Sequence, residues 1–441
     1  MTNEKFLTLV LSVASVLIAT AGAPMASDMR VVKATNKLLK MDYVLSDGPA
    51  IVMLSVATNG VSVGGANLTA VSGDINTIVS GDGPHSFTWN LKDTPLGAAR
   101  KDLKASIKLV CRPLDNPPDY LVVNLAEKTS VPRYTFMETE GELPGGIASN
   151  SAYWTDRIVM RRIHARNVPW VMGCQSFSDR WSAGFSGLPH EVTLTNDYWA
   201  AVFPFTRGQW AAVTSRTCPG QYKFSERRPV DTVVIERKDT AQENKIPALR
   251  GDQSEACRYP HPPHAASLLG LLRARTGLAF DLPGEAMWEY AAKAGTTDEQ
   301  WGDGSPAVAA NLPGRFGGNG GTLDGDQWPD PKTADVSCGT AEVGSYAANR
   351  FGLYDLHGNV NELCLDWHEN DVRGLNGAIN ANGDKTLSGA AGEKNVSKGG
   401  CLGSVYDGCL SSRRYSVIVG NGGRAEGFRV FIHTIDPRLT K

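Results

Sequence analysis

The sequence predicts an α+β chain in which a small all-β sandwich precedes a larger domain with sparse regular structure. Between about residues 27 and 125, short segments alternate apolar and polar residues, and turn residues separate them at the spacing of a sandwich. Clear examples are residues 51–56, 86–89 and 105–110. The 47 glycines exceed the usual share of about 7%, which disfavours a helical bundle.

Composition excludes some classes of function. Charged residues make up 20% and hydrophobic residues 41% of the 441 residues, as expected for a folded, mostly soluble chain. The 44 basic and 46 acidic residues leave a net charge of -2. This balance provides no field that would attract nucleic acid or an anionic membrane surface, so we expect neither as a partner.

The N-terminus has the pattern of a secretory signal peptide, assigned to residues 1–26. An apolar stretch over residues 6–23 follows Lys5 and ends among the small residues Ala21, Ala23 and Ala26. The stretch is also near the minimum length of a membrane span, so an uncleaved anchor stays open. We therefore expect a secreted, periplasmic or cell-envelope protein, without membrane contact beyond this segment. Its eight cysteines make disulfides plausible in an oxidising compartment.

A linker is expected over residues 126–157, because this segment is polar and contains Pro132, Pro144 and adjacent glycines. The sandwich before it, over residues 27–125, is either an adhesion module or a plain spacer; its sequence has no cluster of titratable residues, which favours the spacer.

The domain over residues 158–434 contains the expected helices. Strands are predicted at residues 192–194 and 199–202, and Thr206 is placed to cap a short helix. Two more helices are predicted, one over residues 265–276 that ends at Gly277 and one over residues 284–293 that ends at Gly295. Helical patterns nearly vanish after Gly295. Such a long stretch with few regular elements needs ions, disulfides or aromatic anchors to fix it.

Four segments, in the right order, resemble the formylglycine-generating-enzyme family, also called the sulfatase-modifying-factor domain. They are residues 189–194 with 205–210; DLPGEAMWEYAAKAG at 281–295; GLYDLHGNVNELCLDW at 352–367; and KGG at 398–400 with SSRR at 411–414 and GFRV at 427–430. The resemblance covers about residues 157–432 and implies a C-type-lectin-like fold. We expect Phe428 and Arg429 to be core and salt-bridge residues.

A calcium site is expected in the third of these segments. Asp355 and Glu362 are seven positions apart around a Gly-Asn turn, and hard oxygen ligands in a tight loop suit Ca²⁺. The resemblance implies the same site, with Gly358 and Val360 contributing backbone carbonyls. The alternative is that Asp355 caps a turn and Glu362 is solvated.

The resemblance implies a second calcium site, which the sequence matches more loosely. Its ligands would be Asn311, Leu312, Asp324 and Asp326, in a glycine-rich loop. The spacing is not that of an EF-hand, so a solvated acidic turn is the alternative.

Two departures from the family pattern concern activity. The tryptophans that flank the family's glutamate are Asn361 and Leu363 here, which is consistent with a diverged member whose fold outlasted its activity.

The family holds Cu(I) through two cysteines five residues apart; the second corresponds to Cys409, but the first corresponds to Ser404. Because a hydroxyl is a poor Cu(I) ligand, Cys401 would have to replace the missing thiolate. The alternative is that both thiols are structural, disulfide-bonded or simply buried.

Two functions follow from this pattern. The first is an exported protein of the formylglycine-generating type that matures a sulfatase or other client by oxidising a cysteine; if active, it is a copper-dependent oxidoreductase. The second is a non-catalytic, calcium-stabilised lectin-like module of the cell envelope that binds a surface ligand. In that case the ligand would meet the last loop, residues 402–426, through Tyr406, Asp407, Tyr415, Asn421 and Arg424. An inert structural envelope protein is a third reading.

Overall fold

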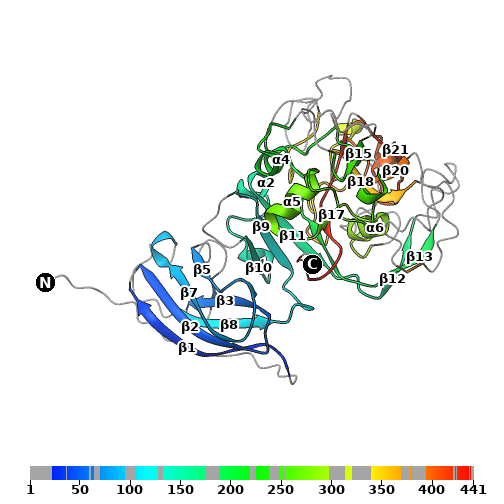
Figure 1. The fold of residues 1–441 in the computed structure, drawn as a ribbon. Coiled ribbons are helices and arrows are strands. Elements are labelled where there is room, and N and C mark those ends of the chain that lie inside the picture. Colours follow the sequence, from blue (N-terminus) through cyan, green and yellow to red (C-terminus); the bar gives the residue numbers. More distant parts are fainter. Residues whose placement is uncertain are drawn as a thin grey trace. The chain divides into compact units, whose positions relative to one another are not determined.

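The computed structural model describes most of the chain, in two compact units (Figure 1). One unit comprises Met1–Asn124 and Lys128–Asn150, and the other comprises Leu125–Glu127 and Ser151–Lys441. The described residues are 22–35, 37–58, 61–63, 70–94, 105–127, 133–173, 189–218, 225–237, 248–252, 254–296, 313–319, 339–368, 378–379, 394–420, 423, 425–436 and 438. The predicted signal segment therefore lies mostly outside them.

Antiparallel strands build the N-terminal unit. One sheet has the order β1 (Met25–Ala34), β2 (Leu38–Ser46), β7 (Gly83–Asn90), β5 (Val71–Gly73). The other has the order β4 (Val61–Ser62), β3 (Ala50–Thr58), β6 (Thr77–Val79), with β8 (Ala105–Arg112) also paired to β3. These strands include the three segments whose alternation predicted them.

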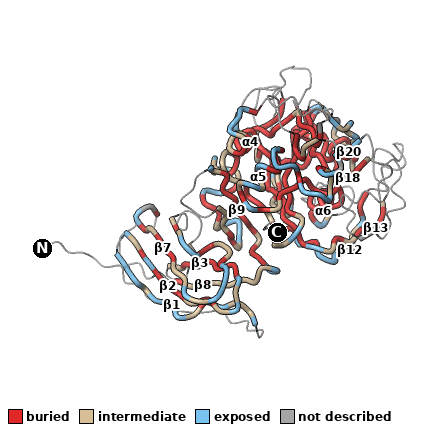
Figure 2. Tube along the Cα trace, in the orientation of Figure 1, coloured by how far each residue is buried: buried red, intermediate tan, exposed pale blue. Residues whose placement is uncertain are grey.

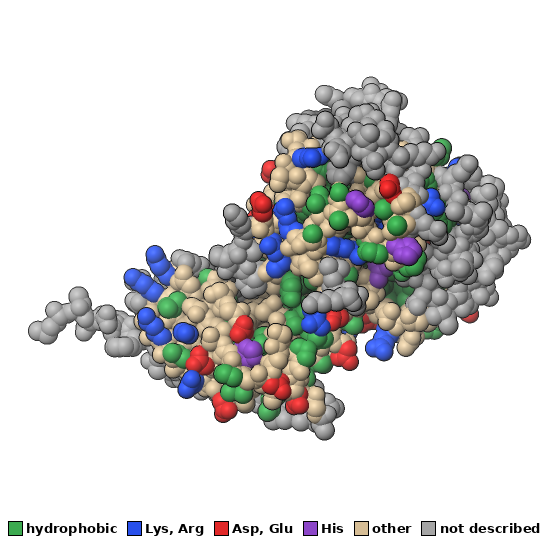
Figure 3. All heavy atoms as spheres, viewed as in Figure 1, with side chains coloured by type: hydrophobic (Ala, Val, Ile, Leu, Met, Phe, Trp, Pro, Cys, Tyr) green, Lys and Arg blue, Asp and Glu red, His purple; other side chains and the backbone are tan. Residues whose placement is uncertain are grey.

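The two sheets of this unit differ in exposure. Strand β3 is buried along most of its length, whereas β1 is mostly exposed or half-buried (Figure 2). The surface of the unit carries both acidic and basic side chains on the face shown in Figure 3. On β2, buried and half-exposed residues alternate, which directs Leu39, Met41 and Tyr43 to one face.

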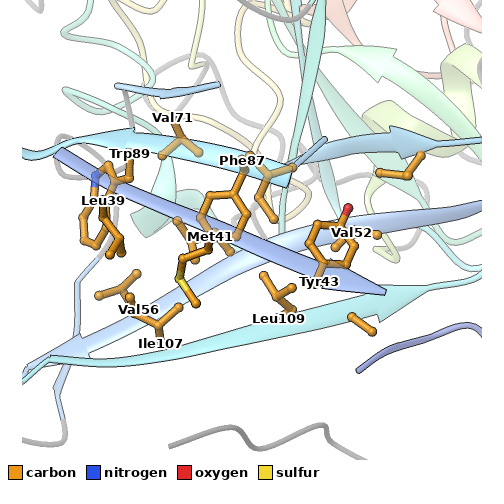
Figure 4. Packing of buried hydrophobic residues seen from close by; sticks show 14 of the residues in the cluster. Leu39, Met41, Tyr43, Val52, Val56, Val71, Phe87, Trp89, Ile107 and Leu109 are labelled. Carbon is orange, nitrogen blue, oxygen red and sulfur yellow. The ribbon is translucent and has the colours of Figure 1, made fainter. Parts of the chain in front are cut away.

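That face forms the core of the unit, shown in Figure 4. Met41 and Tyr43 pack in one cluster with Phe87 and Trp89 of β7 and with Leu109 of β8. Each such side chain, when fully buried, contributes about 1.5–3 kcal/mol by leaving water. The period-two pattern of the sequence thus accounts for how the unit is held together.

The boundaries differ from those predicted. Strand β1 begins at Met25, and Ala26 is buried in the core, so the unit starts before residue 27. The predicted linker, 126–157, contains strand β10 (Tyr134–Met137), which pairs with β9 (Tyr120–Asn124), and helix α2 (Ala152–Thr155). The alternation of residues 134–137 is too short to stand out among the prolines and glycines around it.

The C-terminal unit is rich in short strands. Strands β11 (Arg157–Ile163), β14 (Tyr198–Ala201), β23 (Phe431–Ile432) and β17 (Phe280–Asp281) lie side by side in this order. A second sheet has the order β12 (Val168–Met172), β13 (His190–Leu194), β19 (Ala378–Ile379). A third sheet has the order β21 (Tyr415–Ile418), β20 (Lys394–Lys398), β18 (Asn361–Trp367), β22 (Glu426–Gly427). Strand β15 (Glu236–Arg237) pairs with β16 (Gly251–Asp252).

The predicted helices of this unit are present. Helix α4 (Arg207–Thr214) begins after Thr206, whose side chain accepts from the Gln209 N–H in a capping box. Helix α5 (Leu268–Thr276) ends at Gly277, which has φ +71°. Helix α6 (Glu285–Lys293) ends at Ala294, which has the left-handed φ of +47°, one residue before its predicted end at Gly295. No helix among the described residues is both long and apolar enough to cross a membrane.

Helix α6 is buried on all sides, although it carries charged residues. Arg414 donates to Glu285 at 2.6 Å, and Lys398 Nζ donates to Glu289 at 2.9 Å. Buried charges need such partners because their desolvation is costly. Paired in this way, α6 anchors the end of β20, where the candidate site begins.

Candidate functional site

Two glycines turn the chain after β20. Gly399 and Gly400 have φ of +84° and +70°, a region that side chains with a β-carbon rarely adopt. A β-carbon at Gly400 would stand 2.6 Å from the Gly408 carbonyl oxygen and 2.9 Å from the Cys409 sulfur. Glycine is therefore required here for the chain to pass Cys409 and present Cys401.

Hydrogen bonds hold Cys401 in a tight turn. Its N–H donates to Ser404 Oγ at 3.0 Å, and the Ser404 N–H donates to the Cys401 carbonyl at 2.9 Å. The Cys401 sulfur is 3.6 Å from Ser404 Oγ. Burial raises the pKa of the Cys401 thiol, while hydrogen bonds from Ser404 and from the Gly403 N–H act in the opposite direction.

Cys409 lies deeper, in the short 3-10 helix Tyr406–Cys409. It is fully buried and packs with Phe316 and Leu410. Its carbonyl accepts from Nδ1 of His357 at 2.9 Å. Burial raises the pKa of its thiol well above the usual value, and the neighbouring Cys401 adds to this effect. The two sulfurs are thus electrostatic neighbours.

Neither thiol is in a disulfide, and the same holds for the other four described cysteines: Cys111, Cys218, Cys257 and Cys364. Cys174 and Cys338 lie outside the described residues. Two thiols are a donor set that fits a soft ion such as Cu(I), whereas the hydroxyl of Ser404 is engaged in the turn and does not fit. Of the three residues predicted for copper chemistry, two therefore carry suitable donor atoms, and Cys401 is near enough to contribute to the raised pKa of Cys409.

The loop between Asp355 and Glu362, called the acidic loop below, packs directly against Cys409. Gly358 has φ +82°, and a β-carbon there would collide with the Arg315 carbonyl and approach the Cys409 sulfur to 3.4 Å. The Gly358 N–H donates to the Gly399 carbonyl at 2.7 Å. The loop predicted to bind calcium and the turn that presents Cys401 are therefore joined.

Within that loop, Glu362 has close protein partners. Arg429 donates to its two carboxylate oxygens at 2.7 and 3.0 Å, and Trp288 Nε1 donates at 2.6 Å. Arg429 is fully buried, which confirms its predicted salt-bridge role; Phe428 is a core residue, also as predicted. With both oxygens engaged, Glu362 does not fit as a calcium ligand in this arrangement.

Asp355 differs from Glu362. Its Oδ2 accepts from the Gly344 N–H at 2.7 Å, while Oδ1 is buried without a hydrogen-bond partner. Burial raises the pKa of this carboxyl to about 6. Among the described residues, no group of three or more His, Cys, Asp or Glu side chains is arranged to hold a metal ion. Calcium at this loop stays a prediction.

Several predicted residues lie outside the described part of the chain. These are the second calcium set, Asn311, Leu312, Asp324 and Asp326, and the loop residues Asn421 and Arg424. The other residues of the last loop that were predicted to meet a ligand, Tyr406, Asp407 and Tyr415, are each half-buried.

The structure adds one group that the sequence analysis missed. Asn361 Nδ2 donates to Glu426 Oε1 at 3.0 Å, and Glu426 Oε2 is buried without a partner. Burial raises the pKa of Glu426 to about 7, and its negative charge would raise the pKa of Cys401. The signal that could have revealed this pair is Asn361 itself, a polar residue where the family pattern has tryptophan.

Comparison with known proteins shows the family. The model of the sulfatase-modifying factor enzyme 1-like domain matches residues 170–434, more than half of the chain. The chain belongs to this family. The matched residues include Cys401, Cys409 and the whole of the acidic loop.

Particular relatives are more distant. A serine/threonine-protein kinase pkn1 of Chlamydia caviae is 27% identical over 241 residues, 54% of this chain and 33% of the kinase. A formylglycine-generating enzyme of Mycobacterium tuberculosis is 44% identical over 85 residues, 18% of this chain and 24% of the enzyme. The chain thus spans a third of the kinase's length. Treponema denticola variable protein 1 is 23% identical, with a TM-score of 0.43 over 63% of this chain and 95% of its own.

Proposed function

We propose that the C-terminal domain oxidises a cysteine of a client protein, as formylglycine-generating enzymes do, at an altered thiol pair formed by Cys401 and Cys409. The observation that carries this proposal is that neither thiol is in a disulfide and that Gly400, the residue before Cys401, lies directly against the Cys409 sulfur. Both cysteines occupy the segment in which the family resemblance places the copper cysteines. Cu(I) bound between them would supply the activation of O₂.

The chain's own residues have separate roles in this proposal. Cys401 and Cys409 would hold the ion, and the Ser404 hydroxyl would fix the Cys401 turn through its bond to the Cys401 N–H. Phe316 and Leu410, which pack around Cys409, would exclude water from the buried sulfur. Both thiols must lose their protons to bind the metal, and burial opposes this, so binding should strengthen as pH rises.

Copper binding provides the test. Reduced, metal-free protein is titrated with Cu(I) against a chromophoric chelator. We expect one tightly bound ion per chain, lost in both Cys401→Ser and Cys409→Ser. Cys218→Ser is the matched control, because Cys218 is also a buried cysteine outside any disulfide, with its pKa raised by burial to about 12. Tight binding that survives in either of the first two variants would contradict the proposal.

The second candidate is the non-catalytic module. It is favoured by Ser404, which stands where the family pattern has a thiolate ligand and whose hydroxyl instead accepts a hydrogen bond from the Cys401 N–H. In this case the reduced protein binds no copper, and the half-buried Tyr406 and Tyr415 belong to a ligand surface.

Export and calcium belong to the same proposal. The apolar stretch over residues 6–23 supports an exported protein, and the unpartnered Oδ1 of Asp355 supports an ion at the acidic loop. Glu362 would have to release at least part of its contact with Arg429 to serve as a ligand.

A further inference from the structure

A row of lysine and hydroxyl side chains crosses one face of the N-terminal unit. Lys33 of β1 is directly opposite Lys40 of β2, which is opposite Thr88 of β7, which is opposite Ser72 of β5. The adjoining row on β2, β7 and β5 is buried in the core, so the alternation of the strands directs this row outward. Neighbouring strands are about 4.8 Å apart, so the row spans about 14 Å. Both lysines are exposed, and Thr88 and Ser72 are half-buried.

Two more lysines lie at the adjoining end of the sheet. Lys37 comes just before β2, and its carbonyl accepts from the Lys92 N–H at 3.2 Å. Lys37 is three residues from Lys40, at most about 11 Å along the chain. Both added side chains are exposed, so four exposed lysines gather here: Lys33, Lys37, Lys40 and Lys92, called the lysine cluster below. On the face drawn in Figure 3, basic side chains gather at the left end of this unit.

No acid among the described side chains neutralises the lysine cluster. The ion pairs of this unit instead involve Arg30, His85 and Arg112. Asp42, two residues along β2 from Lys40, is bound to Arg30 at 3.0 Å. The cluster therefore keeps its positive charge, although the chain as a whole is close to neutral.

The contact between Lys33 and Lys40 does not serve folding. Like charges directly opposite each other in an antiparallel pair are destabilising. A lysine on an edge strand such as β1 can prevent pairing with other chains. This reason does not apply to Lys40, because β2 lies between β1 and β7. Binding of a polyanion accounts for both lysines, since its charge would neutralise their repulsion.

The side chains around the lysine cluster narrow the class of anion. The aromatic residues of β2 and β7, Tyr43, Phe87 and Trp89, point into the core and are each 1% exposed. They cannot stack on nucleic-acid bases or enter a bilayer. Thr88 and Ser72 instead offer hydroxyl groups, which can both donate to and accept from the hydroxyls of a sugar. A sheet face with charges and hydroxyls in one row fits an extended sugar chain that carries anionic groups.

We propose that the outer face of the sheet β1-β2-β7-β5 binds an acidic polysaccharide, a sugar polymer that carries sulfate or carboxylate groups. The ammonium groups of the lysine cluster bind the anionic groups, and Thr88 and Ser72 bind sugar hydroxyls. This function belongs to the N-terminal unit and is independent of the cysteines and of copper. It favours the adhesion module over the plain spacer.

The experiment measures binding of the full chain to heparin oligosaccharides by isothermal titration calorimetry at several salt concentrations. We expect wild-type binding that weakens as salt rises, because salt screens exposed charges. Each lysine near an anionic surface contributes about a factor of five. Joint replacement of Lys33 and Lys40 by Gln should therefore weaken binding about tenfold or more, and so should joint replacement of Lys37 and Lys92. Lys108→Gln is the matched control, because Lys108 lies on β8 of the other sheet, and it should bind as wild type.

Thermal unfolding separates binding from folding. Lys40→Gln removes a like-charge contact, so at low salt the free protein should unfold at the same or a higher temperature than wild type. A lower unfolding temperature would give Lys40 a structural role and would count against the proposal. The joint Lys37 and Lys92 variant lies outside the facing pair and tests binding independently.

Three further ligands test the class of partner: neutral dextran, vesicles of anionic lipid and single-stranded DNA. At equal salt, each should bind more weakly than the heparin oligosaccharides. The proposal is overturned if any of the three binds as tightly, or if both joint lysine variants bind heparin as wild type does.

Discussion

Arg429 forms a buried ion pair with Glu362, with 2.7 Å between Nη2 and Oε1, and both side chains are at most 1% exposed. Removal of one partner of such a pair leaves a buried charge uncompensated, at a cost of about 3–5 kcal/mol. We therefore expect Glu362→Gln to lower the free energy of unfolding by this amount. The measurement is urea denaturation, with calcium and with a chelator. A loss that appears only when calcium is present would instead identify Glu362 as a calcium ligand.

Gly400→Ala should lower the free energy of unfolding by more than backbone strain alone would. Its φ of +70° costs a non-glycine residue about 1 kcal/mol, and the collisions with Gly408 and Cys409 add about 1–3 kcal/mol. Gly295→Ala is the matched control, because Gly295 has φ +78° but open space around its β-carbon. Denaturation curves that give equal losses for the two variants would contradict the close approach.

Glu426→Gln should stabilise the protein at alkaline pH. Burial raises the folded-state pKa of Glu426 to about 7. The unfolded state ionises first, so the stability present below about pH 4.5 is lost as pH rises toward 7. Glutamine avoids this loss, and the gain should be up to about 3 kcal/mol at pH 8 and much smaller at pH 5. Urea midpoints at the two pH values check this; a gain independent of pH would be the contrary result.

Thr206→Ala should destabilise helix α4 through loss of its cap. The Thr206 side chain accepts from the Gln209 N–H at 3.2 Å and donates to the Trp154 carbonyl at 2.6 Å. The expected loss is about 1–2 kcal/mol, since the donor and the acceptor are both buried. Thr206→Ser keeps the hydroxyl and should recover most of the loss in thermal unfolding. If serine behaves like alanine, the methyl group rather than the cap is responsible.

Local patterns predicted the regular elements well. Thr206 and Gly277 were expected as helix ends, and they serve as such because capping depends on residues within one turn of the helix. Strand β10 was missed because pairing with β9 stabilises it, and a four-residue alternation carries little local signal.

The candidate site was predictable only in part. The resemblance led to Cys401, Ser404 and Cys409, but the role of Ser404 as the hydrogen-bond acceptor in the turn follows from its distance to the Cys401 N–H. Glu362 was expected as a ligand, and the reach of Arg429 across 67 positions of sequence could not be seen. The pairing of Glu426 with Asn361 likewise depends on the parallel register of β18 and β22.

Gly358 is closely confined, because a β-carbon there would collide with the Arg315 carbonyl and would lie 3.4 Å from the Cys409 sulfur. The acidic loop therefore packs directly against the buried sulfur of Cys409. A larger residue at position 358 would have to displace the Cys409 sulfur. The acidic loop and the cysteine segment can therefore change in evolution only together.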